Sequence, residues 1–296
     1  WHTNPENIFT RTLLENSKWQ SGIVEELEYA ENATFQYYSG YEVLDVSPSD
    51  VFTAAEFNWK QAAVNVTASG LETRIQNAGP EQVINLLDSR IRNAEKTMAN
   101  NISEGIYSDG TGSGGKQIGG LQSIVADAGT GTVGGINSTT FSFWQNVTSG
   151  DVAAISVSSD ALLDEMQDMW LETMRGNDKC DLIVADQTFY KRFWDNLQDI
   201  QRITTASEGV AGFQTLKFVT ADVVMDGGPS IKNSGIPALH MYFLNTDYLH
   251  FRVHSDTNFV PFEQKAPVNQ DALVVPILFA GNLTCSNRSL QGVVYT

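Results

Sequence analysis

The sequence contains few cysteines and no long apolar run, and each shortage excludes a class of protein. The two cysteines, Cys180 and Cys285, lie far apart and cannot form the disulfide framework of a small secreted domain. The longest apolar run, around Ala272–Ala280, is interrupted by Pro276 and falls short of the roughly 18 residues typical of a membrane-spanning helix. We therefore expect a chain that neither depends on disulfides nor crosses a membrane.

Positive charge is also scarce in the sequence. Lys and Arg number 18 against 35 Asp and Glu, so the formal net charge is −17. Duplex DNA is usually bound by a basic stripe, whereas the longest basic run here is the pair Lys191-Arg192. Direct electrostatic binding of nucleic acid or of anionic lipid is therefore disfavoured. With 42% hydrophobic and only 18% charged residues, the composition favours a folded chain over a disordered one.

Hydrophobic periodicity predicts an α+β fold. Apolar residues spaced by three or four predict a long amphipathic helix over Pro80–Ile106, and two more helices over 159–175 and 187–197. Asn245-Thr246-Asp247 is typical of a tight hairpin between two strands. The segments that read as strands are Leu121–Val125, Phe141–Asn146, Leu182–Ala185, Leu216–Val219, Ala238–Leu244, Tyr248–His254, Ala272–Leu283 and Leu290–Tyr295.

The segment 25–69 is rich in aromatic residues and poor in aliphatic ones. Strand-like stretches such as Thr34–Tyr38 and Phe57–Lys60 are separated by the turn signal Ser47–Asp50. This pattern predicts a long hairpin-like loop that cannot close a core of its own, so its aromatic rings need a partner surface. The candidate residues for an assembly interface are Phe35, Tyr37, Tyr38, Phe57 and Trp59.

The patterns that could carry chemistry are incomplete. Gly110–Gln117 nearly matches a phosphate-binding loop, but Gln117 replaces the hydroxyl that would hold magnesium, and a helix precedes the loop where a strand is needed. Two histidines, His250 and His254, would lie about 13 Å apart on a strand, too far to share one metal. No nucleophile elbow is found. The sequence therefore predicts no catalytic, cofactor or metal site, and no enzyme.

The order of the predicted elements resembles that of one known family. The chain has an N-terminal arm, a long loop, one long helix, a glycine-rich connector and terminal strands. Three short sequence segments after the long helix also match that family, namely Gln117–Val125, Gly134–Asn137 and Phe143–Asn146. In these features the chain resembles the major capsid proteins of tailed double-stranded DNA bacteriophages, which share the Hong Kong 97 fold. The resemblance covers essentially the whole chain and consists of element order, not of a catalytic signature.

This resemblance implies a domain organisation and a function. It assigns residues 1–24 to an N-terminal arm, 25–69 to an extended loop, 70–125 and 238–280 to a peripheral domain, and 126–237 and 281–296 to an axial domain. Copies of the chain would assemble in the host cytoplasm, as pentamers and hexamers, into the icosahedral capsid of a virion. That shell would enclose DNA without reading its sequence. Portal, scaffolding or decoration proteins would be further partners.

Two alternatives remain open at this point. Some relatives cross-link the extended-loop lysine to an asparagine of the peripheral domain, which here would join Lys60 to Asn282 or Asn287, whereas others assemble without covalent bonds.

A different function, a secreted carbohydrate-binding or other ligand-binding module, fits the six tryptophans and the seven Asn-X-Ser/Thr sequons. Hollow particles would favour the shell, and a monomer with a closed concave pocket would favour the binding module.

Overall fold

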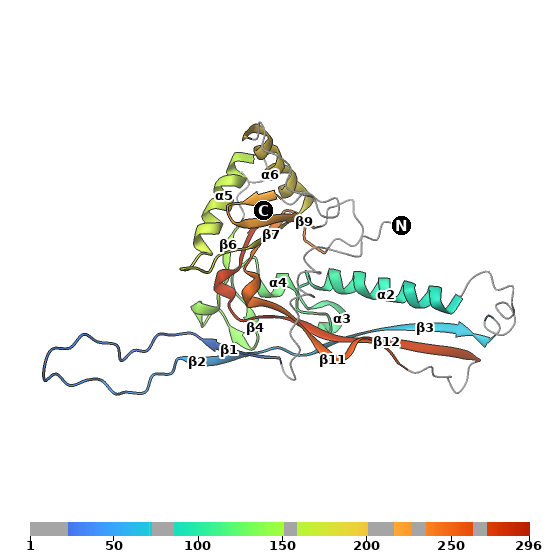
Figure 1. The fold of residues 1–296 in the computed structure, drawn as a ribbon, viewed down its shortest axis with the longest axis horizontal. Coiled ribbons are helices and arrows are strands. Elements are labelled where there is room, and N and C mark those ends of the chain that lie inside the picture. The colour runs from blue at the N-terminus through green and yellow to red at the C-terminus, as the bar shows by residue number, and fades with distance from the viewer. Residues whose placement is uncertain are drawn as a thin grey trace.

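The computed structural model describes residues 23–70, 72, 86–150, 159–200, 216–226, 235–262 and 271–296. These residues form a projecting ribbon, an elongated sheet beneath one long helix, and a second sheet with two helices (Figure 1). No helix among them is long and apolar enough to span a membrane. The predicted N-terminal arm lies outside the described residues, apart from Ile23 and Val24.

The ribbon consists of two antiparallel strands, β1 (Val24–Glu28) and β2 (Phe52–Glu56). Their pairing runs without a break from Val24 opposite Glu56 to Glu28 opposite Phe52. Residues 29–51 continue beyond the strands without helix or strand and extend away from the rest of the molecule (Figure 1). The hairpin-like excursion predicted from the sequence is therefore present, but its strands differ from the predicted ones: Thr34–Tyr38 is not a strand, and Phe57–Lys60 contributes only Lys60 to one.

An antiparallel sheet of three strands forms the elongated part of the molecule. Its strands are β3 (Lys60–Ser69), β11 (Leu249–Pro261) and β12 (Ala272–Cys285), in the order β11-β12-β3. The resemblance assigned residues 60–69 to the extended loop, but they pair with β12 over their whole length. The reason is the alternation of β3, which places Val64, Val66 and Ala68 on one face, where they need a core.

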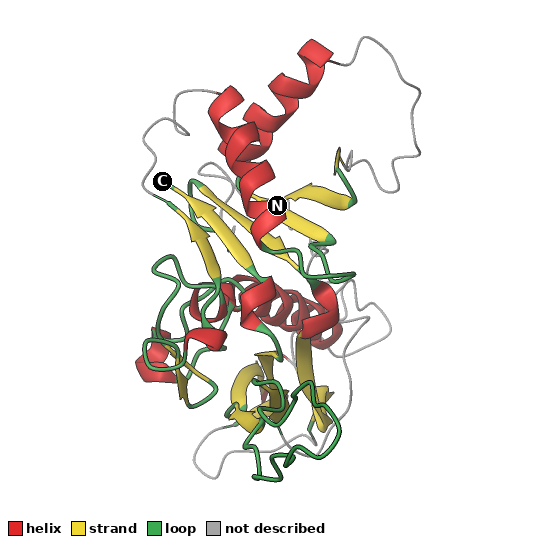
Figure 2. Cartoon of the chain, turned by 90° about the vertical axis from the view of Figure 1, so that its left-hand side faces the viewer, coloured by secondary structure: helices red, strands yellow, loops and turns green. Residues whose placement is uncertain are grey.

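That core is supplied by the long helix α2 (Leu86–Gly105), which lies over this face of the sheet (Figures 1 and 2). The first residues of the predicted helix, 80–85, lie outside the described residues, and its predicted end near Gly105 is confirmed. Buried apolar residues of the helix and the sheet form one cluster, which includes Ala94, Met98, Ile102, Val66, Val275 and Ile277. Burial of this stripe holds the helix on the sheet.

The second sheet lies in the upper part of Figure 2, with helices packed against it. Its strands are β6 (Val147–Ser149), β7 (Leu182–Ala185), β8 (Leu216–Phe218), β9 (Ala221–Met225), β10 (His240–Leu244) and β13 (Gly292–Tyr295). The strand order is β6-β13-β10-β7-β9-β8. The helices α5 (Ser159–Glu172) and α6 (Gln187–Ile200) bury Met166 and Phe189 against it. Both helices and the strand at 182–185 were predicted from the sequence.

Two strands predicted after the long helix are also wrong. Leu121–Val125 contains the short helix α4 (Leu121–Ile124), and Phe141–Asn146 contains the 3-10 turn η2 (Ser142–Trp144). In each segment a single helical turn places the apolar side chains toward the core. Leu121, Ile124 and Trp144 are therefore buried although the segment does not form a strand. The other short elements are α3 (Gly112–Gly115), β4 (Thr132–Val133), β5 (Ile136–Asn137), η4 (Thr246–Tyr248) and η5 (Arg288–Leu290).

The hairpin predicted around Asn245 is also wrong, because β10 and β11 belong to different sheets. Gln291 explains the difference. Its side-chain oxygen accepts from the Asn245 backbone N–H at 3.0 Å, and its amide donates to the Asn245 carbonyl at 3.1 Å. These two bonds occupy the backbone of Asn245, and the chain passes through η4 from one sheet into the other.

Both cysteines are buried free thiols. Burial raises the pKa of Cys180 well above its usual range and that of Cys285 to about 12. The thiols therefore stay protonated near neutral pH.

The packing of α2 gives a first testable prediction. Met98 is 2% exposed, so Met98→Ala should lower the free energy of unfolding by about 2–5 kcal/mol through lost burial and a cavity. Denaturant unfolding of the unassembled subunit measures this change. Lys96→Ala, on the exposed side of the same helix, is the control and should stay within about 0.5 kcal/mol of wild type. Equal effects of the two variants would contradict the packing described here.

Candidate assembly surface

Exposed apolar side chains are concentrated on the ribbon. Scattered exposed apolar residues are ordinary on protein surfaces, but a continuous strip of them marks an interface. Tyr37 and Val43 are each 92% exposed. The strip comprises Phe35, Tyr37, Tyr38, Tyr41, Val43, Leu44, Val46 and Phe52. The described part of the subunit leaves all of these side chains exposed.

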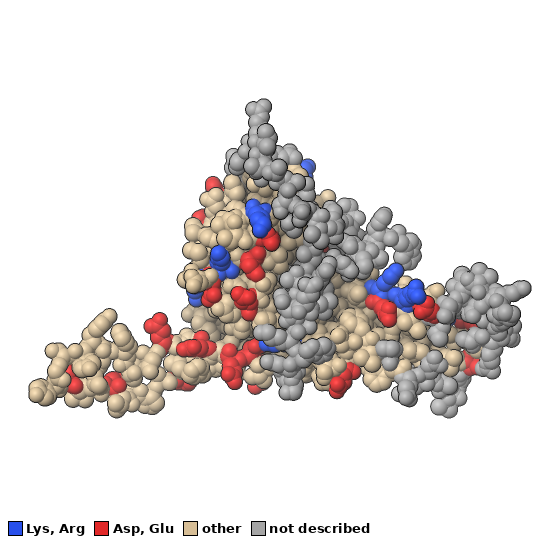
Figure 3. All heavy atoms as spheres, viewed as in Figure 1, with Lys and Arg blue, Asp and Glu red and all other residues tan. Residues whose placement is uncertain are grey.

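The ribbon carries charge of only one sign. Residues 24–59 contain eight acidic residues and no Lys or Arg. Acidic side chains gather where the ribbon meets the body of the molecule, and the distal part is mainly uncharged (Figure 3). Contacts made by the distal part therefore depend on apolar and aromatic burial, with electrostatics of secondary importance.

The five predicted interface residues fall into two groups. Phe35, Tyr37 and Tyr38 lie in the exposed strip, and the rings of Phe35 and Tyr37 meet edge to face at 5.3 Å. Phe57 and Trp59 lie at the base of the ribbon and are half-buried within the subunit. Phe57 packs against both neighbouring hydrophobic clusters, and Trp59 meets the ring of His254 edge to face at 5.4 Å.

The base of the ribbon obtains its core from a distant part of the chain. Leu27 and Ala55, one from each strand, are buried against Trp144 of η2. The Trp144 indole donates to the Val133 carbonyl at 3.0 Å, so its ring is held in place. Next to it, the Glu56 N–H donates to the Gly134 carbonyl at 2.9 Å. The ribbon therefore leaves the subunit from a packed and hydrogen-bonded base.

A buried ion pair ties the ribbon to the three-stranded sheet. One carboxylate oxygen of Glu25 accepts from Arg252 Nε at 3.1 Å, from Arg252 Nη2 at 2.8 Å and from Thr284 Oγ1 at 3.0 Å. The side chains of Arg252 and Glu25 are only 5% and 12% exposed. Because both charges are withdrawn from water, removing either one leaves the other unpaired at a high cost. The pair therefore sets the position of β1 relative to β11 and β12.

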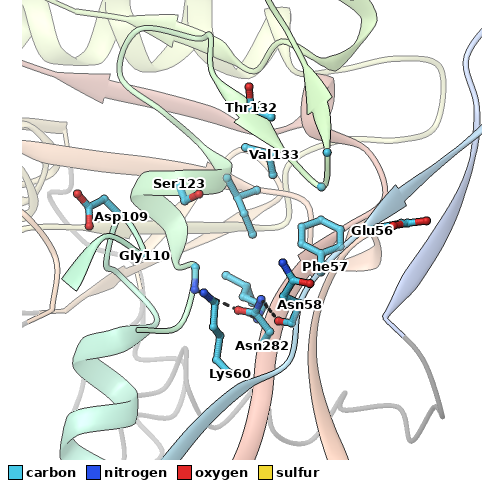
Figure 4. A pocket seen from close by; sticks show the side chains of 15 residues that line it. Glu56, Phe57, Asn58, Lys60, Asp109, Gly110, Ser123, Thr132, Val133 and Asn282 are labelled. Carbon is cyan, nitrogen blue, oxygen red and sulfur yellow. Dashed lines mark hydrogen bonds between the residues drawn. The ribbon is translucent and has the colours of Figure 1, made fainter. Parts of the chain in front are cut away.

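A cavity of about 270 Å³ lies beside the ribbon base, and Figure 4 shows the side chains that line it. Asn282 contributes to its wall and is 4% exposed. The Asn282 amide donates to the Asn58 carbonyl at 2.9 Å, and its oxygen accepts from the Gly119 N–H at 3.0 Å. This amide thus joins the start of β3 to the glycine-rich segment.

Lys60 lies in the same wall (Figure 4). Its ammonium group donates to the carbonyl of Gly115. Lys60 is paired along the sheet with Gly281, so it and Asn282 are neighbours within one subunit. Asn287, the other candidate partner, holds η5 by accepting from the Ser289 N–H at 3.1 Å.

The near-match to a phosphate loop at Gly110–Gln117 contains only the single turn α3, in which the backbones of Ser113 and Gly114 adopt the left-handed conformation.

Sequence reasoning missed Arg288, which joins three segments. It is fully buried and donates to the Ile124 carbonyl at 2.6 Å, the Trp144 carbonyl at 3.0 Å and the Asn146 side-chain oxygen at 2.9 Å. Burial lowers its pKa to about 10, so it remains charged at neutral pH. Its neighbours in the sequence, Asn287 and Ser289, are polar and gave no signal of this role, and two of its three partners are main-chain groups.

Comparisons with known proteins identify the fold. No family model and no curated protein matches the sequence. The capsid subunit of cyanophage A-1(L) superposes over 100% of this chain and 94% of its own, with a TM-score of 0.71 at 15% identity. The capsid of Myoviridae phage XM1 superposes over 96% of this chain and 91% of its own, with a TM-score of 0.60 at 13% identity. The chain has a phage capsid fold. This confirms, for the fold, the resemblance found in the sequence.

The same capsid fold occurs in one neighbour that is described as an encapsulin. The encapsulin complex from Synechococcus elongatus PCC 7942 covers 99% of this chain and 87% of its own, with a TM-score of 0.62 at 8% identity. The three neighbours therefore cover between 96% and 100% of this chain.

The ion pair at the ribbon base gives a second prediction. Glu25→Gln leaves the Arg252 charge buried without a counter-ion and should reduce the free energy of unfolding by about 3–5 kcal/mol. Glu26→Gln, at the exposed neighbouring position, is the matched control and should have little effect. Denaturant unfolding of both variants provides the comparison.

A double variant tests the coupling between the two charges. In Glu25→Gln/Arg252→Met the unpaired charge is gone, so part of the lost stability should return. If the losses of unfolding free energy caused by the two substitutions simply added, the carboxylate and the guanidinium would be energetically independent. That result would contradict the role of the ion pair in positioning β1.

Proposed function

We propose that this chain is a major capsid protein, a structural and non-enzymatic subunit that assembles with copies of itself into an icosahedral shell around a double-stranded DNA phage genome. The observation that carries this proposal is the phage capsid fold over the full length of the chain. The ribbon adds support, because its apolar strip requires a second surface and a neighbouring subunit of a shell supplies one at every position.

The proposed organisation keeps the four parts that the resemblance implied. Residues 1–24 act as the N-terminal arm, and 25–69 as the extended loop, although 60–69 pair with β12. The sheet under α2 belongs to the peripheral domain, made of 70–125 and 238–280. The six-stranded sheet belongs to the axial domain, made of 126–237 and 281–296.

We assign assembly to the exposed strip of the ribbon. An isolated two-stranded ribbon is at best marginally stable in water, so its distal part gains order from a neighbour. Burying Phe35, Tyr37 or Tyr38 would contribute about 1.5–3 kcal/mol per ring. Phe57 and Trp59 take a different part in the proposal, because they position the ribbon from its half-buried base.

The remaining partners follow from the same proposal. A net charge of −17 disfavours adhesion of the shell to the enclosed DNA, which suits filling and release of a genome. Its proposed partners are portal, scaffolding or decoration proteins. The subunit would assemble in the host cytoplasm and become part of the virion. A covalent link from Lys60 to Asn282 or Asn287 is not needed for this proposal.

The comparisons do not support the alternative of a secreted carbohydrate-binding module, because the solved structures that match over the whole chain are shell subunits. The encapsulin neighbour makes the contents of the shell a separate question. Particle formation and enclosed DNA therefore need independent measurements.

The proposal predicts that the expressed chain forms closed hollow particles visible by electron microscopy, and that particles made during phage infection protect DNA from nuclease. A monodisperse monomer at high protein concentration would contradict the shell. Closed particles with the wild-type fold that never contain nuclease-resistant DNA would contradict the phage assignment and leave the shell intact.

The role of the ribbon predicts a separation of folding from assembly. Tyr37→Ser/Tyr38→Ser should leave the subunit melting temperature unchanged, because both rings are exposed, and should lower the particle yield at least tenfold. Leu171→Ser removes an apolar side chain that is 56% exposed on α5 and serves as the matched control. A double variant that assembles as well as the control would remove the ribbon strip from the assembly interface.

A further inference from the structure

The two edges of the three-stranded sheet differ in a way that points to a contact between copies. Edge strands expose unpaired backbone groups, and proteins usually protect them with bulges, charges or proline. β11 has these protections: its pairing breaks between Val253 and Asn258, Asp256 lies in the break, and Pro261 ends the strand. The opposite edge, β3, pairs with β12 in an unbroken register and has no charged residue after Lys60.

Three hydrogen bonds show which residues of β3 face outward from the sheet. The Gly70 N–H donates to the Asp271 carbonyl, which places the even-numbered positions toward β12. The Thr67 carbonyl instead accepts from Arg90, and the Ser69 N–H donates to Glu72. Because both backbone groups of a strand residue point to the same side, the odd-numbered positions carry the outward N–H and carbonyl groups.

One end of this outward edge is closed by a clamp. Arg90 donates to both carboxylate oxygens of Glu72, at 2.8 and 2.9 Å, and to the Thr67 carbonyl at 2.7 Å. The Arg90 guanidinium lowers the pKa of Glu72 to about 2, so the clamp stays ionised at neutral pH. The clamp closes the edge at Thr67. The outward backbone N–H and carbonyl groups of Gln61, Ala63 and Asn65 remain accessible.

No hydrogen bond from the described residues reaches the outward backbone groups of Gln61, Ala63 or Asn65. Their side chains are all exposed, on the sheet face opposite α2. Backbone groups that remain open on a straight, uncharged strand are a template for another strand.

We propose that residues 61–65 of β3 pair with the same residues of a second copy, as antiparallel strands related by a two-fold axis at Ala63. This rests on the proposed function, since it names one contact between subunits of the shell. Ala63 would face Ala63 of the second copy, and Gln61 would face Asn65 on either side. Each of these three pairs exchanges two backbone hydrogen bonds, so the sheets of two subunits become continuous.

Side chains and charge favour this particular occupant. Alanine at the symmetric position leaves room for the second strand, and the amides of Gln61 and Asn65 are complementary donors and acceptors across the pair. Two copies of a chain with a net charge of −17 repel each other over most of their surface. β3 contains no acidic residue, so the strands can approach without direct repulsion between carboxylates.

A disulfide trap tests the register. In a hydrogen-bonded antiparallel pair the Cα atoms lie about 5.5 Å apart, within the range that a disulfide accepts. Ala63→Cys should therefore give at least tenfold more disulfide-linked dimer under mild oxidation than Thr67→Cys. The Thr67→Cys control shares the strand and the face, but two copies of position 67 would lie about 26 Å apart. The native cysteines are fully buried and do not compete.

The outcomes separate this contact from the shell itself. Particles that form normally without a link through position 63, or with equal links through 63 and 67, would overturn the pairing and leave the proposed function standing. If wild type forms no particles, the proposed function fails. Dimers linked through Cys at position 63 would still support the pairing in that case, and their absence would reject it.

A proline variant provides an independent measurement. Ala63→Pro removes an outward N–H, which an edge strand tolerates within its own subunit, and blocks the second strand. Compared with Ala63→Ser, it should leave the subunit melting temperature within a few degrees and reduce particle yield at least tenfold. A large loss of subunit stability would show that this N–H serves β12, and normal assembly would show that the edge is not used. Either result would contradict the proposal.

Discussion

The buried pair of Glu25 and Arg252 is the interaction on which the position of the ribbon depends. Two short strands have too little core to hold a direction in space. Here the direction comes from outside the ribbon: the carboxylate is held by Arg252 and Thr284 on the sheet, while Leu27 and Ala55 are packed on Trp144. A buried ion pair contributes little net stability compared with apolar packing, but it penalises every other orientation, because each one leaves a charge unpaired.

Arg288 performs a comparable task between the two sheets. Its guanidinium accepts no hydrogen bonds and offers donors in a fixed plane, so it can hold the carbonyl groups at the ends of the single helical turns α4 and η2. The loops around α4 and η2 need such a partner, because a buried loop otherwise leaves backbone groups unsatisfied. Together with the Gln291–Asn245 pair, Arg288 makes the crossing between the sheets a defined part of the fold.

Sequence periodicity predicted the elements whose apolar residues repeat regularly. α2, α5, α6 and β7 were found because a stripe or a run of apolar residues identifies each of them without reference to the rest of the chain. The errors have tertiary causes. The short connection at 245–247 suggested a hairpin, but Gln291, distant in sequence, occupies the backbone there. The pairing of residues 60–69 with β12 could not be predicted from the sequence, because β12 lies about two hundred residues away. Phe57 and Trp59 show that residue type alone does not separate a half-buried ring from exposed rings such as Tyr37.

The one-sided charge of the ribbon also determines how proteases recognise it. Between Lys18 and Lys60 the chain has no Lys or Arg, so trypsin finds no site in the most exposed part of the molecule. Chymotrypsin, which cleaves after aromatic residues, finds its sites at Phe35, Tyr37, Tyr38 and Tyr41, which a free subunit leaves accessible and a neighbour would cover. Cleavage by chymotrypsin therefore reports whether the ribbon is covered, whereas trypsin has no site between residues 19 and 59 in either state.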